Sequence, residues 1–183
     1  MESLRMRLSQ MKSKQDSFLI ADWVGDNTER YHLLTKSFFA DEYRESQRAA
    51  MVLGHVHDRQ PHLIKPYLPQ MIEHLRRADI HDAGKRNIVR TLQTVDLPED
   101  LWGKAADICF TFVADPGTAV AIRVFSMTVL WNLCQKIPEL MPELRATIED
   151  WLDYGTAGFK SRGKKILKQI SAYEQKYGHF GHP

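Results

Sequence analysis

One apolar pattern recurs four times along the chain at nearly constant spacing. The copies of this leucine pattern step by 39, 38 and 37 residues, and they read Leu53-Gly-His-Val56, Leu92-Gln-Thr-Val95, Leu130-Trp-Asn-Leu133 and Leu167-Lys-Gln-Ile170. A fixed period of this size indicates one supersecondary unit stacked on copies of itself. The pattern therefore constrains the fold strongly, and it requires no active site.

A second pattern repeats with the same step. Two proline-containing segments begin at Pro61 and Pro138, and they lie 77 residues apart, which is also the separation of Leu53 from Leu130. Pro98 holds the corresponding place in the middle unit. Proline is favoured at the first position of a helix because its missing N–H costs nothing there. Each unit is therefore expected to contain two helices, the second of which opens at a proline.

The remaining chain shows helical periodicity and no strand pattern. Leu19 is expected to hold the place of Leu53 in an irregular first helix pair. Nine helices are expected. In chain order they cover 15–24, a segment from an Asn27 cap through Phe38, a segment from an Asp41 cap through Val56, 61–77, a segment from Asp82 through Val95, 98–113, 119–135, 138–152 and 157–177. Helices joined by short loops are antiparallel. The sequence thus predicts an all-α fold, an α-α superhelix of about four helix pairs followed by a C-terminal capping helix.

The domain organisation follows from the extent of this pattern. Residues 15–177 are expected to form a single helical repeat domain, preceded by an N-terminal extension or short helix over 1–14 and followed by a flexible tail over 178–183.

The repeated units resemble the HEAT-type and the related armadillo-type α-solenoids. The resemblance is carried by three full units, Ser46 to Leu75, Arg86 to Val113 and Arg123 to Leu152, and by a partial fourth from Arg162 to Ile170. The recurring Asp and Arg pair that forms a polar ladder in such stacks is not found in the sequence. The resemblance implies a scaffold or adaptor that binds another macromolecule, most commonly a protein, and it identifies no particular subfamily.

Composition limits the cellular locations and the kinds of partner that are expected for the chain. Lys and Arg number 25 against 23 Asp and Glu, so the net charge of +2 implies no overall attraction to nucleic acid or to an anionic membrane. No apolar run approaches the ~18 residues that suggest a membrane span. Cys109 and Cys134 stand in apolar surroundings, as thiols in a reducing compartment usually do. A cytoplasmic protein without a cofactor is expected.

The uneven distribution of charge marks one candidate binding site. From Thr156 to Pro183, six Lys and Arg residues stand against Glu174 alone. Three of the lysines follow one another at intervals of four residues and so share a helix face. The candidate binding residues are Lys160, Arg162, Lys164, Lys165 and Lys168. Two interpretations stay open: this face binds phosphate or an acidic partner, or it is neutralised by the acidic segment 137–153, which should pack beside it.

Two further clusters of residues, one of arginines and one of histidines, are considered as binding sites. The arginine pairs Arg44/Arg48 and Arg86/Arg90 each have i, i+4 spacing, but the two pairs do not align in the repeat register. His55, His57, Asp58 and His62 fall within eight residues. Because residues two apart on a helix point to different sides, they are poorly placed to converge on one metal ion, and no metal site is predicted.

The alternative function is nucleic-acid binding through the basic C-terminal helix, in a protein related to the HEAT-like alkylpurine DNA glycosylases. Glycosylase chemistry needs a carboxylate beside an aromatic surface. The residues four positions after the tryptophans are Asn27, Ala106, Gln135 and Gly155, and none of them is acidic. The sequence also contains no phosphate-binding loop, zinc-protease motif or nucleophile elbow. No catalytic residue is assigned and a non-enzymatic role is favoured, while an active site assembled only in three dimensions and the oligomeric state are left open.

Overall fold

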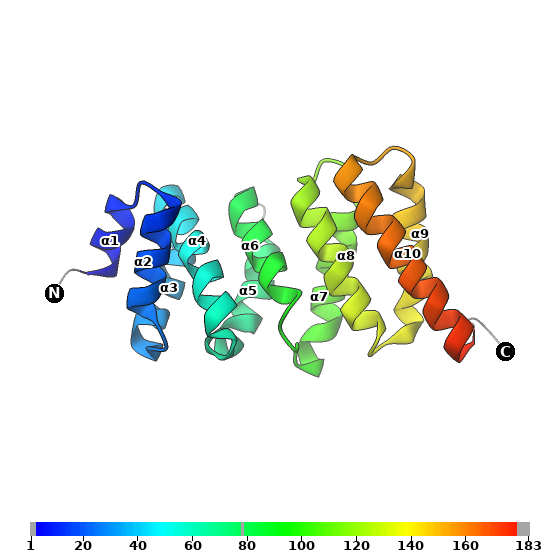
Figure 1. The fold of residues 1–183 in the computed structure, drawn as a ribbon, viewed down its shortest axis with the longest axis horizontal. Helices are drawn as coiled ribbons and strands as arrows, with labels where there is room; N and C mark the ends of the chain where they lie inside the picture. Colours follow the sequence, from blue (N-terminus) through cyan, green and yellow to red (C-terminus); the bar gives the residue numbers. More distant parts are fainter. Residues whose placement is uncertain (1–2, 78, 179–183) are drawn as a thin grey trace. The chain divides into compact units, whose positions relative to one another are not determined.

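The chain folds into helices joined by short turns and loops (Figure 1). The computed structural model describes residues 3–77 and 79–178, and this part of the chain contains no strand. The helices pack into two compact units, residues 1–91 and 92–183, and each unit is described by itself below. The expected all-α fold of HEAT-like helix pairs, with one further helix at the C-terminal end, is confirmed.

Unit 1 is built around α4. Helices α2 and α3 both pack against α4, and the short helix α1 also contacts it. The core is formed by side chains that are at most 5% exposed, among them Ile20, Leu34, Phe38, Leu53, Ile64 and Ile72. The helices of this unit are α1 (Leu4–Gln10), α2 (Lys14–Val24), α3 (Thr28–Phe38), α4 (Tyr43–Arg59), the 3-10 segment η1 (Pro61–Tyr67), α5 (Leu68–Leu75) and α6 (Asp82–Leu92), whose last residue already belongs to unit 2.

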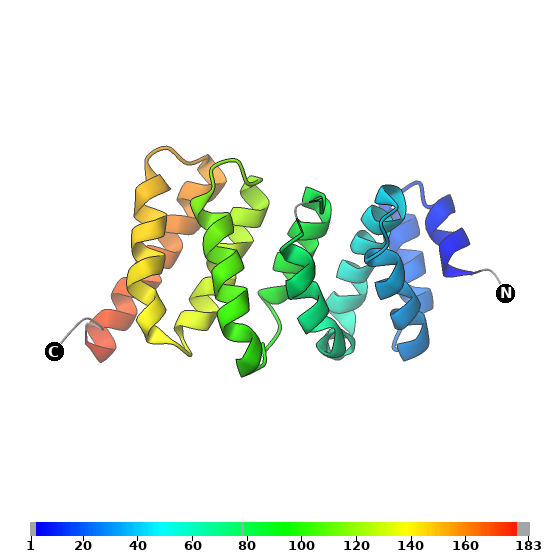
Figure 2. The same ribbon diagram turned by 180° about the vertical axis from the view of Figure 1, so that it is seen from behind.

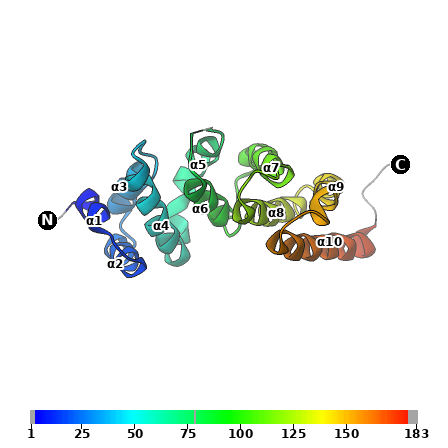
Figure 3. The ribbon, with the colours of Figure 1, turned by 90° about the horizontal axis from the view of Figure 1, so that it is seen from above.

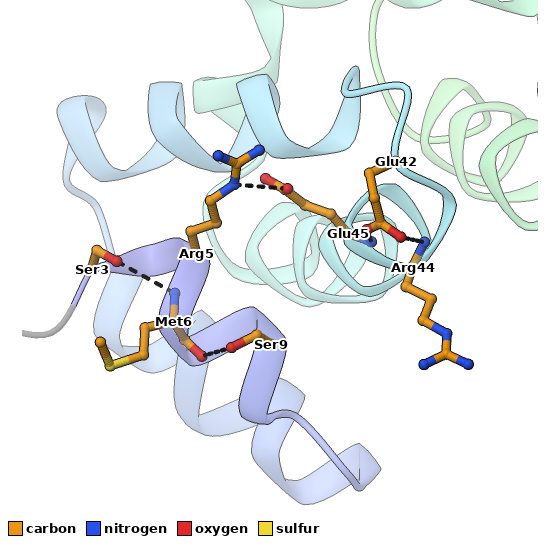
Figure 4. A network of polar contacts seen from close by, with 7 residues as sticks. All are labelled: Ser3, Arg5, Met6, Ser9, Glu42, Arg44 and Glu45. Atoms are coloured by element: carbon orange, nitrogen blue, oxygen red, sulfur yellow. Dashed lines mark hydrogen bonds and ion pairs between the residues drawn. The ribbon is translucent and has the colours of Figure 1, made fainter.

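Two expected helix caps have different outcomes. The Asn27 side chain accepts a hydrogen bond from the Arg30 N–H at 2.9 Å, so that cap is confirmed. The cap predicted at Asp41 is wrong, because Glu42 accepts the N–H groups of Arg44 and Glu45 (Figure 4). The Asp41 carboxylate is instead ion-paired with Arg77 at 3.0 Å. A contact 36 residues away thus decides which of the two neighbouring acids caps α4.

The second helix of the second pair is also interrupted. A continuous helix over 61–77 was expected, whereas a 3-10 segment precedes α5 and the helix ends at Leu75. Pro66 lies inside the 3-10 segment and cannot donate the backbone hydrogen bond that a continuous α-helix would need.

The apolar register of the first helix is shifted by one residue. Leu19 was expected to be equivalent to the buried Leu53, but Leu19 is 59% exposed and its neighbour Ile20 is 5% exposed. Helix α2 therefore turns Ile20, together with Ala21 and Val24, into the core of unit 1.

The segment over 1–14, expected as an extension or short helix, contains α1, which is fastened to α4 by polar contacts. The Arg5 Nε donates to the Glu45 Oε2 at 2.9 Å (Figure 4). The Arg48 guanidinium donates to the Ser9 carbonyl oxygen at 2.9 Å. Together with the buried Leu4 and Leu8, these bonds hold α1 on unit 1.

Unit 2 consists of two layers of helices. Helices α8 and α10 form the layer in front in Figure 1, and α7 and α9 form the layer in front in the reverse view of Figure 2. Figure 3 shows the same two layers from above. The bounds are α7 (Glu99–Ala114), α8 (Val120–Cys134), the 3-10 turn η2 (Pro138–Leu140), α9 (Met141–Leu152) and α10 (Ala157–Tyr177).

Most members of the leucine pattern lie in the core, as expected. Within unit 2, Leu92, Leu130, Leu133 and Ile170 are at most 3% exposed, and in unit 1 Leu53 and Val56 are at most 2% exposed. The two remaining members, Val95 and Leu167, are half-buried.

A buried arginine ties the two layers of unit 2 together. Arg123 of α8 is 6% exposed, and its Nε and Nη2 both donate to the Val113 carbonyl oxygen at the end of α7. Its guanidinium also lies 4.2 Å from the ring centre of Phe159 in α10 and 5.5 Å from that of Trp151 in α9. Burial lowers the pKa of Arg123 from its ordinary value. One side chain thereby contacts all four helices of the unit.

Three charge pairs between residues about one repeat apart were not predicted. In unit 1, Asp22 pairs with Arg59, and the Asp58 carboxylate pairs with Arg90 at 2.8 Å. In unit 2, Asp96 pairs with Lys136. The members of these pairs are 37, 32 and 40 residues apart, which is close to one repeat. The chain thus has periodic polar contacts, formed from residues that do not occupy equivalent positions.

Two further observations concern the ends and the membrane. The expected flexible tail over 178–183 lies, apart from Gly178, outside the described residues. Over the described ranges, no helix combines the length and the apolar character needed to cross a bilayer.

Candidate functional site

Helix α10 carries all the predicted binding residues, and apolar contacts fix its orientation. The Thr156 hydroxyl caps its first turn by accepting the Phe159 N–H. Phe159, Ile166 and Ile170 are at most 2% exposed and pack toward α8 and α9. Gly163 allows a close approach to α9, because a Cβ atom at this position would lie 2.9 Å from Ile148 Cγ2. The opposite side of the helix is consequently turned outward.

Four of the five predicted residues lie on or beside this outward side. Lys164, Lys165 and Lys168 are exposed, and Lys160 is half-buried. We refer to these four lysines as the cationic face. Of the other exposed positions of the helix, Ala157, Gly158, Ser161, Ala172 and Gln175 are small or uncharged, and Lys176 and Tyr177 lie at its C-terminal end. No acidic side chain interrupts the cationic face.

Arg162 does not belong to the cationic face. Its guanidinium donates to the Thr128 Oγ1 of α8 at 2.7 Å, and the side chain is half-buried. The contact joins α10 to α8, so Arg162 positions the helix and is not available as a free cation.

The acidic neighbour of α10 does not neutralise the lysines by direct pairing. Helices α9 and α10 do pack together, but the ion pair between them has the opposite polarity, because Arg145 of α9 contacts Glu174 of α10 at 2.5 Å. Within 3–77 and 79–178, none of the four lysines forms an ion pair with another residue. The cationic face is therefore left to solvent or to a ligand.

The exposed side of α9 is acidic. Glu143, Glu149 and Asp150 are exposed on the helix, and Asp153 is exposed at its end. We refer to these four residues as the acidic face. Glu149 lies 3.7 Å from Arg145 of the same helix. The other three form no ion pair with any described side chain. Unit 2 thus carries an unpaired cationic face on one layer and a largely unpaired acidic face on the other.

The arginine pairs of the first helices serve partly structural roles. Arg48 bonds to the Ser9 carbonyl oxygen, and Arg90 donates to both oxygens of Asp58. Arg44 and Arg86 are exposed. Since one member of each pair holds helices together, the structure does not assemble the four arginines into one site.

The neighbouring histidines have separate partners. His55 stacks on Phe18 with ring centres 4.1 Å apart, whereas His62 contacts the Asp26 carboxylate at 2.8 Å. His57 is 5% exposed, and burial lowers its pKa. In the described part of the chain, no three His, Cys, Asp or Glu side chains are grouped as metal ligands.

Trp102 and Trp23, which each have an acidic residue three positions away in the sequence, are engaged in packing. Trp102 donates its indole N–H to the Leu97 carbonyl oxygen at 2.8 Å, and the Lys136 ammonium lies 5.1 Å from its ring centre. The cavity beside Trp102 has a volume of about 30 Å³, the space of one water molecule in the liquid. This cavity cannot hold a flipped nucleobase. Trp23 lies within 4.9 Å and 4.5 Å of the Arg7 and Arg30 guanidinium groups, and Arg30 also bonds to its carbonyl oxygen.

A larger hollow lies in unit 1 between the ends of α4 and α5. Its volume is about 170 Å³, and its walls include His74, His81, Arg77 and the carboxylates of Asp41 and Asp79. Arg77 is already paired with both carboxylates, at 3.0 and 2.6 Å. Burial lowers the pKa values of His74 and His81, so near neutral pH these histidines add little positive charge and the two carboxylates share the single cation of Arg77.

Comparison with known proteins agrees with this architecture. A family model described as a HEAT repeat domain matches residues 4–170. No curated protein and no solved structure matches the chain significantly. The family match spans α1 through most of α10 and includes all four copies of the leucine pattern. The chain therefore belongs to the HEAT repeat family.

Proposed function

We propose that this protein is a non-enzymatic scaffold that binds an acidic segment of another protein through the cationic face of α10. HEAT repeats in general mediate interactions between macromolecules, and their binding surfaces are extended helix faces rather than deep pockets. The observation that carries the proposal is the row of lysines that no described acid pairs with, although an acidic helix packs beside them.

The charge pattern favours an acidic protein segment over nucleic acid. A nucleic-acid strand is usually held by aromatic stacking and arginine as well as by phosphate contacts, and the cationic face itself contains lysines alone; the exposed aromatic of α10, Tyr177, lies at the far end of the helix. A duplex laid along α10 would also bring phosphates toward the acidic residues of the adjoining α9. A short acidic segment avoids that repulsion because it covers one helix face alone.

Two other properties of the chain are proposals of the same kind. Both cysteines are free and buried, which supports a site of action in the reducing cytoplasm. The family match over residues 4–170 supports a single repeat domain that includes both compact units.

The proposal is tested by titrating the full chain into a fluorescent glutamate-rich peptide and into a fluorescent DNA duplex. We expect the peptide to bind more tightly than the duplex. Binding should weaken as salt is added, because both partners are charged. The variant K164E/K168E should lower the peptide affinity at least about tenfold, since each lost pair becomes a repulsive one.

A matched control variant has the same net charge as K164E/K168E. The variant K36E/K65E reverses two exposed lysines of unit 1, and it should leave the affinity for the peptide nearly unchanged. Equal loss in both variants would show that net charge alone governs binding and would refute the assignment to α10. Tighter binding to the duplex than to the peptide would replace the proposal with the nucleic-acid alternative.

A further inference from the structure

We infer that the cationic face of α10 binds the acidic face of α9 in a second copy of this chain. The inference rests on the proposed function, because it names the acidic segment that the cationic face would take. Each copy contains both surfaces, so the partner is already present in any solution of the protein.

The two faces are complementary in charge and in length. Lys160, Lys164 and Lys168 extend over about 12 Å of helix axis, and Glu143 and Asp150 are separated by about 10 Å, at 1.5 Å of rise per residue. Lys164 and Lys168 are exposed, as are Glu143, Asp150 and Asp153. None of these five residues forms an ion pair with another residue of the described chain.

Within one copy the two faces cannot satisfy each other. They belong to different layers of unit 2, the cationic face to the layer of α8 and α10 and the acidic face to the layer of α7 and α9 (Figure 3). The contact between α9 and α10 is made by their inner sides, through Ile148, Leu152 and Gly163 and through the pair of Arg145 with Glu174. The outward charges of one copy are therefore accessible to those of a second copy.

Helix stability does not explain the acidic face. Glu149 and Asp150 lie in the last turn of α9, and Asp153 is the C-cap residue. Acidic side chains at a helix C-terminus interact unfavourably with the helix dipole, and the last turn of α9 contains no basic residue that would offset them. A partner with the opposite charge removes this unfavourable interaction.

The contact is heterologous, since one copy contributes α10 and the other contributes α9. Such contacts repeat from copy to copy and form rings or open chains. The association should therefore grow with concentration rather than stop at a tight dimer, and it should depend strongly on salt because its energy comes from exposed charges.

Sedimentation equilibrium of the full chain tests the first consequence. At an ionic strength of about 0.01 M, where the Debye length is about 30 Å, the average mass should rise above the 21.2 kDa of one chain as the concentration increases. At about 1 M, where the Debye length is about 3 Å, it should return to that of one chain. Association that is unaffected by salt would overturn the inference.

Charge reversal tests the two surfaces separately. K164E/K168E and E143K/D150K should each weaken self-association at least about tenfold, because each places like charges opposite one another. An equimolar mixture of the two variants should associate again, since α10 of one then faces α9 of the other with opposite charges. The control K36E/K65E should associate like the natural chain. A mixture that stays monomeric would overturn the inference.

This experiment distinguishes the inference from the proposed function. A chain that stays monomeric at low salt, but still binds the glutamate-rich peptide through Lys164 and Lys168, would overturn the second-copy partner and leave the scaffold function intact. Failure of both self-association and peptide binding would overturn both. All substitutions lie at exposed positions, where changes in stability are usually within about 0.5 kcal/mol, and circular dichroism checks that each variant is folded.

Discussion

At the residue scale, Arg123 joins the helices of unit 2 through a single side chain. Its two bonds to the Val113 carbonyl oxygen come from Nε and Nη2 of one planar guanidinium, a pairing that a lysine cannot reproduce. We expect Arg123→Lys to lower the free energy of unfolding by about 1.5–3 kcal/mol, the usual value of hydrogen bonds to a charged group. Urea unfolding measures this change. The same substitution at the exposed Arg86 is the control, and equal effects at both positions would contradict the role of Arg123.

The two thiols provide a second prediction at this scale. Cys109 and Cys134 are both 0% exposed, and burial raises the pKa of each to about 12. Because the thiolate is the reactive form, a disulfide reagent at neutral pH should label neither thiol in the folded protein. It should label both once urea unfolds the chain. Rapid labelling of either cysteine before unfolding would show that unit 2 opens far more readily than its packing indicates.

At the element scale, two helical glycines should respond oppositely to alanine. Gly103 of α7 has no atom within 4 Å of where a Cβ would stand, so Gly103→Ala should stabilise the protein by about 0.5–1 kcal/mol through helix propensity. At Gly163 the new Cβ would lie 2.9 Å from Ile148 Cγ2 and 3.1 Å from Leu152 Cδ1. Gly163→Ala should therefore destabilise it by about 1 kcal/mol or more. Thermal unfolding of the pair checks both signs, and stabilisation by both would refute the close contact of α9 with α10.

The helices themselves could be predicted from the sequence because each buries a periodic apolar side. Details that depend on distant residues could not be predicted. The cap at Glu42 instead of Asp41 goes with the ion pair of Asp41 and Arg77, which lies just after α5, 36 residues along the chain. In the candidate site, too, the residues could be predicted but their distant contacts could not. Its lysines were identified from spacing alone, but the engagement of Arg162 with Thr128 depends on how α10 is rotated against α8.

At the scale of the whole molecule, the two units differ in histidine content, and we expect their stability to respond differently to acid. No histidine lies between residues 92 and 178, whereas unit 1 contains six. Burial lowers the pKa values of His55, His57, His74 and His81 below the ordinary 6.5. The folded form therefore binds fewer protons than the unfolded form. Stability from these groups is present above pH 6.5 and is lost as the pH falls below it.

We therefore expect unit 1 to open before unit 2 when the pH is lowered from about 7 to about 5. Hydrogen exchange followed by mass spectrometry, corrected for intrinsic rates, would locate the loss of protection in α4 and α5. Earlier loss in α8 to α10 would contradict the prediction. Asp79 does not change this order, since Arg77 lowers its pKa to about 2 and it stays ionised throughout this range.

The three charge pairs about one repeat apart are relevant to folding during synthesis. Asp22 with Arg59, Asp58 with Arg90 and Asp96 with Lys136 are separated by 32 to 40 residues. Each pair can form as soon as its second residue has left the ribosome. None of the pairs requires the C-terminal end of the chain. In a repeat protein, contacts between neighbouring units allow structure to propagate from one unit to the next. Each newly made helix should thus pack against the preceding repeat, so that little apolar surface is exposed while translation continues.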